Sequence, residues 1–171
     1  MAISTFDGPV RSLNGFYSQG PGNLLTLGAT VTLSVATHAG HTLLVPATCA
    51  ITLPVIVTTA DPASSGPGSD PNTQSNLGVE FNLFYNAIAT DTTSQTITTG
   101  VAGDKFVGAL TVMGTTTMAF ASVTNTIITL NKTTTGGAAR GSCVTIVALA
   151  ANLWSVNGIL LGSGSVATPF S

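Results

Sequence analysis

Apolar residues recur at every second position in several short segments of this chain, and this period constrains the fold more than any motif does. The clearest runs are Val31, Leu33 and Val35, then Val79, Phe81 and Leu83, and then Ile128 and Leu130. Successive side chains of a β-strand point to opposite faces of its sheet. Each run therefore predicts a strand with one buried face.

Residue usage supports the same interpretation. Threonine makes up about one residue in six, and its β-branched side chain suits a pleated, half-buried surface. The chain has one Glu, two Lys and three Gln, so the residues that usually form exposed helical faces are scarce. We expect strands near 24–27, 29–37, 41–46, 49–53, 55–60, 78–88, 94–99, 105–113, 115–123, 125–131, 142–149 and 153–161. Short strands separated by Gly, Asn, Asp and Pro predict an all-β fold, either an antiparallel β-sandwich of jelly-roll-like form or a β-barrel.

The 171 residues suit a single domain. We expect one β-domain over residues 24–171 and an extended N-terminal arm over residues 1–23, because the arm has no strand period of its own. Residues 61–76 are rich in Pro, Gly and Ser and predict a long loop. Residues 132–141 predict a second, flexible loop.

Charge is the next constraint. Charged residues make up 6% of the chain, against roughly 25% in an average soluble protein. The four cations are scattered singly, and phosphate-backbone binding needs clustered cations, so we expect no nucleic-acid partner. No stretch approaches the roughly 20 apolar residues of a membrane-spanning helix, and the N-terminus lacks a secretory pattern. We therefore expect no membrane partner, and we expect the mean hydropathy of +0.50 to be hidden in a core and in contacts between chains.

Metal and cofactor motifs are weak. His38 and His41 are three residues apart, but no further ligand lies near them in the sequence, so we interpret them as isolated polar side chains at a strand junction. Asp61, Asp70 and Asp91 lack the spacing of a calcium loop and are ordinary turn residues. We expect neither a metal nor a cofactor.

Catalytic motifs are also missing. The chain has no G-x-S-x-G elbow of a serine hydrolase. Glycosidases need two facing carboxylates, and Glu80 is the only Glu, so the sequence gives little support to that chemistry. We expect no enzymatic activity. Cys49 and Cys143 are expected to be reduced and buried, with a bridge between them left open. Trp154 is expected in the core, where a lone Trp of a sandwich usually lies, with a sugar-binding face as the alternative.

Several segments together resemble the small all-β cement, or decoration, proteins on the outside of tailed-bacteriophage heads. They span nearly the whole chain and comprise residues 8–11, 13–16, 20–21, 39–45, 52–54, 103–108, 136–141, 154–164 and 167–170. The resemblance implies a homotrimer in the virion, on the outer surface of the capsid, that binds the major capsid protein and stabilises its lattice. Such a protein would be made in the host bacterial cytoplasm.

Two functional hypotheses follow. In the first, the arm of a cement protein contacts a neighbouring subunit or the capsid through its charged and apolar anchors, which are Phe6, Arg11, Leu13, Phe16 and Tyr17. The alternative is a head-fibre or receptor-binding β-domain that recognises host surface glycans. Its contact residues would be Trp154, Tyr85 and Asn-rich loops, since sugars stack on aromatic faces.

Overall fold

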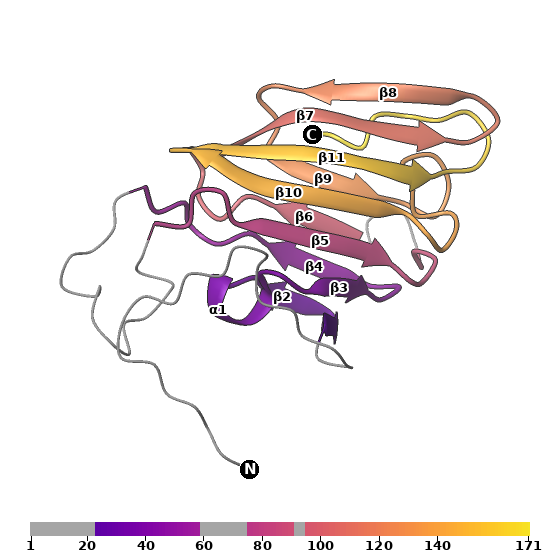
Figure 1. The fold of residues 1–171 in the computed structure, drawn as a ribbon. Coiled ribbons are helices and arrows are strands. Elements are labelled where there is room, and N and C mark those ends of the chain that lie inside the picture. Colours follow the sequence, from indigo (N-terminus) through magenta and orange to yellow (C-terminus); the bar gives the residue numbers. More distant parts are fainter. Residues whose placement is uncertain (1–22, 59–74, 91–94) are drawn as a thin grey trace, which may run out of the picture.

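The computed structural model describes residues 23–58, 75–90 and 95–171, and these form two stacked β-sheets (Figure 1). The expected all-β fold is confirmed, because eleven strands and one short helix account for the regular structure of the described residues. The elements are β1 (Leu24–Thr26), β2 (Thr30–Thr32), α1 (Val35–His38), β3 (Thr42–Val45), β4 (Cys49–Thr52), β5 (Glu80–Tyr85), β6 (Gln95–Thr98), β7 (Lys105–Met113), β8 (Thr117–Ser122), β9 (Ile127–Leu130), β10 (Cys143–Ala150) and β11 (Leu153–Leu161).

The two sheets differ in size and are both mixed. The larger sheet has seven strands in the order β1-β3-β5-β10-β11-β7-β8, and the smaller has four in the order β2-β4-β6-β9. β1, β3 and β5 are parallel, as are β2, β4 and β6 and the pair β7 and β11. The expectation of a purely antiparallel, jelly-roll-like sandwich is therefore wrong in its strand directions, although the sandwich itself is present.

The parallel pairs result from the path of the chain. From β1 to β6, successive strands alternate between the larger and the smaller sheet, so each pair of strands makes one coil of a short solenoid. Neighbouring coils then stack with their strands parallel. After β6 the pattern changes: the β10–β11 hairpin lies antiparallel against β5, and β9 lies antiparallel against β6. Hydrophobic alternation is the same in both arrangements, which is why it did not predict the strand directions.

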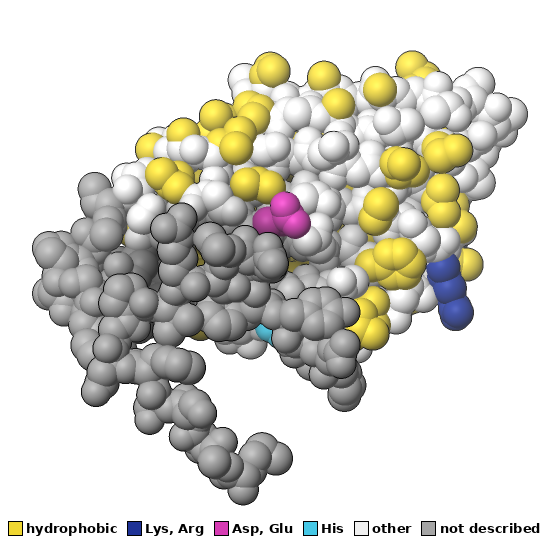
Figure 2. All heavy atoms as spheres, viewed as in Figure 1, with side chains coloured by type: hydrophobic (Ala, Val, Ile, Leu, Met, Phe, Trp, Pro, Cys, Tyr) yellow, Lys and Arg dark blue, Asp and Glu magenta, His cyan; other side chains and the backbone are white. Residues whose placement is uncertain are grey.

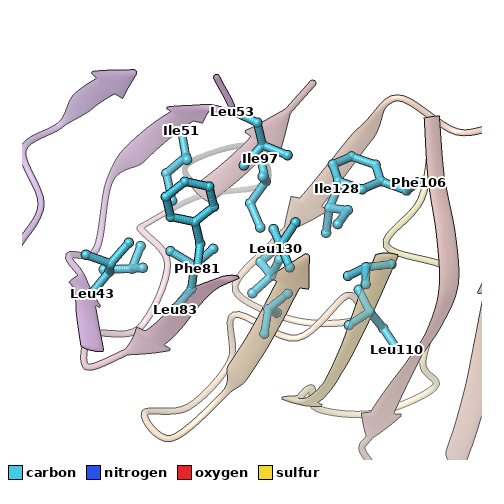
Figure 3. Close-up of a cluster of buried hydrophobic side chains, with 14 of the residues drawn as sticks. Leu43, Ile51, Leu53, Phe81, Leu83, Ile97, Phe106, Leu110, Ile128 and Leu130 are labelled. Carbon is cyan, nitrogen blue, oxygen red and sulfur yellow. The ribbon is translucent and has the colours of Figure 1, made fainter. Parts of the chain in front are cut away.

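The core lies between the sheets and contains one side chain from every second position of the longer strands. Figure 3 shows these side chains pointing inward from both layers, and the fully buried ones include Leu43, Ile51, Phe81, Ile97, Phe106, Leu110, Ile128 and Trp154. The rings of Phe81 and Trp154 are tilted by 43° with centroids 6.2 Å apart. Each such large side chain contributes about 1.5–3 kcal/mol of burial free energy, so this shared interior is what holds the two sheets together.

One expected strand is shortened and another is not formed, and local hydrogen bonds give the reason. The alternation through Val35 predicted a strand over 29–37, but β2 ends at Thr32 and α1 begins at Val35. The Ser34 amide donates to His38 Nδ1 at 3.0 Å and so closes this short helix. Residues 55–58, the described part of the strand expected over 55–60, pair with a side chain instead. Asn76 accepts from the Val57 amide and donates to the Val55 carbonyl, both at 2.8 Å, and so replaces a neighbouring strand.

The loop expected to be flexible over 132–141 is fixed in place, which corrects that expectation. The Asn131 side-chain oxygen accepts from the amides of Thr133, Thr134 and Thr135 at 2.6–3.0 Å. Ser142 Oγ donates to the Gly136 carbonyl at 2.7 Å inside the protein. Gly136 and Gly137 are buried, and these internal hydrogen bonds satisfy several of the loop's backbone groups without water.

Gly136 offers a test of how tightly this loop packs. Its φ is +112°, and a Cβ there would meet the side chain of Leu160. We predict that Gly136→Ala lowers the free energy of unfolding by about 2–4 kcal/mol, through backbone strain and overpacking together. Urea unfolding would measure it. Gly78→Ala is the matched control, since Gly78 has a φ of +79° and nothing within 4 Å of such a Cβ. Equal losses in the two variants would show that the loop yields easily.

Candidate interaction surface

Titratable side chains of the described residues do not gather into a catalytic or metal-binding cluster. Among residues 23–58, 75–90 and 95–171 there is no group of three or more His, Cys, Asp or Glu side chains that could hold a metal. His38 and His41 each bond locally: His38 Nδ1 accepts from the Ser34 amide, and His41 Nδ1 lies 3.1 Å from the Ala39 carbonyl oxygen. Burial lowers the pKa of His38. Each ring therefore makes its own local contact, and His38 lies in the last turn of α1 and not at the end of a strand as expected.

Cys49 has none of the properties of a nucleophile. It is buried on β4, its thiol donates to the Gly28 carbonyl at 3.1 Å, and burial raises its pKa to about 11. Nucleophilic cysteines need a lowered pKa, so this thiol is a core group. The nearby Tyr85 hydroxyl is also buried and has no hydrogen-bond partner in the described part of the chain. Burial, with a smaller effect from Cys49, raises the pKa of Tyr85.

Cys143 differs from Cys49 and from the expectation that both thiols are buried. Both cysteines are free, but Cys143 is exposed on the outer face of β10. The two cysteines are on different sheets, Cys49 facing the interior and Cys143 facing out, so each is kept from the other by the core between them.

Asp104 is a buried carboxyl group at the start of β7. The Trp154 indole donates to its Oδ2 at 3.2 Å, and its Oδ1 has no partner among the described residues. Burial raises the pKa of Asp104, and the hydrogen bond from Trp154 offsets part of that effect. The side chain of Trp154 is fully buried, which confirms that it belongs to the core.

The aromatic residues of the glycan-binding alternative lie inside the protein. Trp154 and Tyr85 are 0% and 1% exposed, because both point into the space between the sheets. Neither ring can stack on a sugar in this fold. The structure thus removes the two aromatic contacts on which that alternative was based.

The outer face of the larger sheet is the feature that stands out. Strand register places Leu44, Phe84, Cys143 and Ile159 side by side on β3, β5, β10 and β11. We call these four residues the apolar row. Phe84 is 39% exposed and Ile159 is 48% exposed, so the row is open to solvent. Thr111 on β7 and Ala119 on β8 continue the same line to the edge of the sheet.

A second line of side chains beside the apolar row is polar but uncharged. It comprises Thr42, Asn82, Thr145 and Asn157 on the same four strands. Asn82 connects two of its neighbours: its amide donates to Glu80 Oε1 at 2.6 Å, and its oxygen accepts from Thr145 Oγ1 at 2.9 Å. The side-chain amide is therefore held in one orientation on the surface.

Charge is sparse on this face. Among the outward-facing strand residues of the larger sheet, the charged ones are Glu80 and Lys105, one at the start of β5 and one at the start of β7. Figure 2 shows hydrophobic side chains spread among neutral ones over these strands, with little acidic or basic surface between them. A large sheet face with both apolar and neutral polar groups is suited to contact with another protein surface.

The sequence prediction of site residues concerned a different region. Phe6, Arg11, Leu13, Phe16 and Tyr17 lie in the predicted arm, outside the described residues. The apolar row was missed, although the signal was present: Phe84 and Cys143 each follow an inward-facing residue of a predicted strand. Apolar residues at the positions between core residues indicate a strand with apolar side chains on both faces.

Comparison with known proteins adds no assignment. No family, no curated protein and no solved structure matches this chain. The one helix in the described residues, α1, has four residues, and no described helix is long and apolar enough to cross a membrane.

The Asp104–Trp154 pair generates a pH-dependent prediction. Because the pKa of Asp104 is higher in the folded protein than in the unfolded chain, where it is near 3.8, the free energy of unfolding depends on pH. The contribution of Asp104 is most favourable below pH 3.8 and is lost as pH rises through the folded pKa. Asp104→Asn keeps an acceptor for the Trp154 indole and cannot ionise. We predict that the variant becomes more stable relative to the wild type as pH rises from 3 to 7. Urea unfolding at each pH measures this gain; a constant difference between the two proteins would contradict it.

Proposed function

We propose that this chain is a structural virion protein, a capsid decoration protein that binds the outer surface of a phage head as a trimer and stabilises the lattice of the major capsid protein. The observation that carries the proposal is the nearly uncharged outer face of the larger sheet, with the apolar row exposed along it. A surface of this kind recognises another protein by shape and burial rather than by long-range charge. The resemblance of the sequence to phage cement proteins supports the same function.

The physical demands of such a role fit this surface. A decoration protein binds many equivalent sites on one shell, and each contact benefits from neutral groups whose desolvation costs little. Each subunit can bind weakly when three bind as one unit, because attachment of the first raises the effective concentration of the others. We expect light scattering to give the free protein a mass of three times 17.1 kDa.

Recognition of host glycans is the second candidate, and the described residues support it less. The aromatic side chains assigned to it, Trp154 and Tyr85, are buried. We also propose no enzymatic role, since Cys49 and Asp104 are core groups and His38 and His41 make only short-range contacts, to Ser34 and to the Ala39 carbonyl.

Ile159→Glu tests the use of the sheet face. Ile159 lies at one end of the apolar row and is 48% exposed, so the folded state should tolerate the change. Buried against a capsid, the new carboxylate would have no partner, and we predict at least tenfold weaker binding to shells stripped of the protein, about 1.4 kcal/mol. Co-sedimentation with such shells measures the change.

Val55→Glu is the matched control for that experiment. Val55 is 54% exposed and follows β4, a strand of the smaller sheet, so it lies away from the apolar row. Binding by this variant should stay within twofold of the wild type. If Ile159→Glu also binds normally, the outer face of the larger sheet is not the capsid contact.

Removal of residues 1–20 tests the predicted arm. We propose that Arg11, Leu13, Phe16 and Tyr17 contact a neighbouring subunit or the capsid. The shortened protein should then keep its strand content by circular dichroism and lose binding to shells. Unchanged shell binding would rule out a role for the arm and leave the sheet face to carry the contact.

A further inference from the structure

The four sheet edges of this protein are not equally protected. Free edges present unpaired amides and carbonyls, and proteins usually shorten, cover or charge them to prevent pairing with other chains. In the larger sheet the edges are β1 and β8, and in the smaller sheet they are β2 and β9. β1 and β2 have three residues each, so they offer little backbone to a partner.

The edge at β9 is covered by the C-terminal segment of the chain. Phe170 bridges to Ile128, the Ile127 amide donates to the Ser171 carbonyl at 3.0 Å, and the Thr129 amide donates to the Pro169 carbonyl at 2.8 Å. This segment serves as a fifth, irregular strand of the smaller sheet. Three of the four edges are therefore short or covered.

β8 has none of these protections. It has six residues, Thr117–Ser122, with the sequence TMAFAS, which contains neither a charge nor a proline. It pairs with β7 on one side, and no described residue pairs with its other side. Six residues extend for roughly 20 Å. Met118, which is 48% exposed, adds apolar surface to this edge.

We propose that β8 binds β8 of a second copy of this chain, antiparallel and across a two-fold axis, so that two larger sheets join into one of fourteen strands. An antiparallel pair of identical strands is self-complementary, and six residues on each side can exchange up to about six main-chain hydrogen bonds. The absence of charge on β8 means that no like charges meet across the seam. The chain is also poor in charge overall, so little electrostatic repulsion keeps two copies apart.

The surface groups continue across this seam. Residues directly opposite each other in an antiparallel pair lie on the same face, so the two-fold axis passes at Ala119 or Phe120 in the middle of β8. Both registers keep the outer faces of the two sheets on the same side. With the axis at Ala119, the line of the apolar row runs on into the same line of the second copy; with the axis at Phe120, it meets the line of Ala121 and Ala109 instead.

This contact is independent of the proposed function. A two-fold pairing of β8 joins molecules in pairs, whereas the decoration role implies a threefold association and a contact with the capsid. An experiment can therefore disprove the β8 pairing without disproving the decoration role, and the reverse.

Disulfide trapping tests the pairing. In a Cys143→Ser background, Ala119→Cys combined with Ala121→Cys places thiols at the seam in either register. Opposed Cβ atoms would then be about 5 Å apart, which suits a disulfide. We expect mild oxidation to convert most of the folded protein into a covalent dimer of twice 17.1 kDa on a non-reducing gel.

The matched control carries Ala109→Cys and Thr111→Cys, because these β7 residues lie beside Ala121 and Ala119 on the same face. Across the proposed dimer their positions are three strand spacings apart, roughly 14 Å, which is too far for a disulfide. The proposal requires a linked dimer in the β8 variant and only a trace in this control. Equal linkage in the two variants, or none in the β8 variant, would overturn it.

Hydrogen exchange of the unmodified protein is the second measurement. In the paired state all β8 amides of residues 118–122 should be protected at high protein concentration. On dilution, alternate amides should lose protection, namely those that bond to the second copy and not to β7. Exchange of β8 that does not change with concentration, while the β8 variant gives no linked dimer, would show that the edge stays free.

Discussion

The two sheets of this protein are held by one shared interior, and most other features of the molecule depend on that contact. Phe81 and Trp154 from the larger sheet and Ile128 from the smaller sheet are all fully buried between the two. The inner faces hold few polar groups, and one of them, Asp104, accepts a hydrogen bond from the Trp154 indole. Because the interior uses every second residue, the residues between them are free to define the outer surface.

That outer surface is the basis of the proposed function. On the larger sheet the freed positions hold either neutral polar groups or the apolar row, and charged groups are almost absent from it. Most proteins place charge on an exposed sheet, which keeps molecules apart. A face without that charge, together with an unprotected strand at β8, suits a protein that works within an assembly.

Several titratable groups of the described residues are occupied by the fold itself. Catalysis requires titratable groups that are both poised and reachable. In this chain Cys49 and Asp104 are buried with raised pKa values, and His38 and His41 are used for local backbone contacts. Each of these groups makes a hydrogen bond or packing contact within the fold. For this reason the proposed function is based on the outer surface and not on these groups.

The sequence by itself determined the secondary structure and the interior. Alternation identified ten of the eleven strands closely, because the burial of one strand face is a local property of residues two apart. Two long-range choices were decided only by the tertiary structure. Parallel coils and antiparallel hairpins bury the same residues, so the direction of β3 against β5 could not be predicted from the period. The apolar row likewise exists only once Phe84, Cys143 and Ile159, far apart in the sequence, are brought side by side by the strand register.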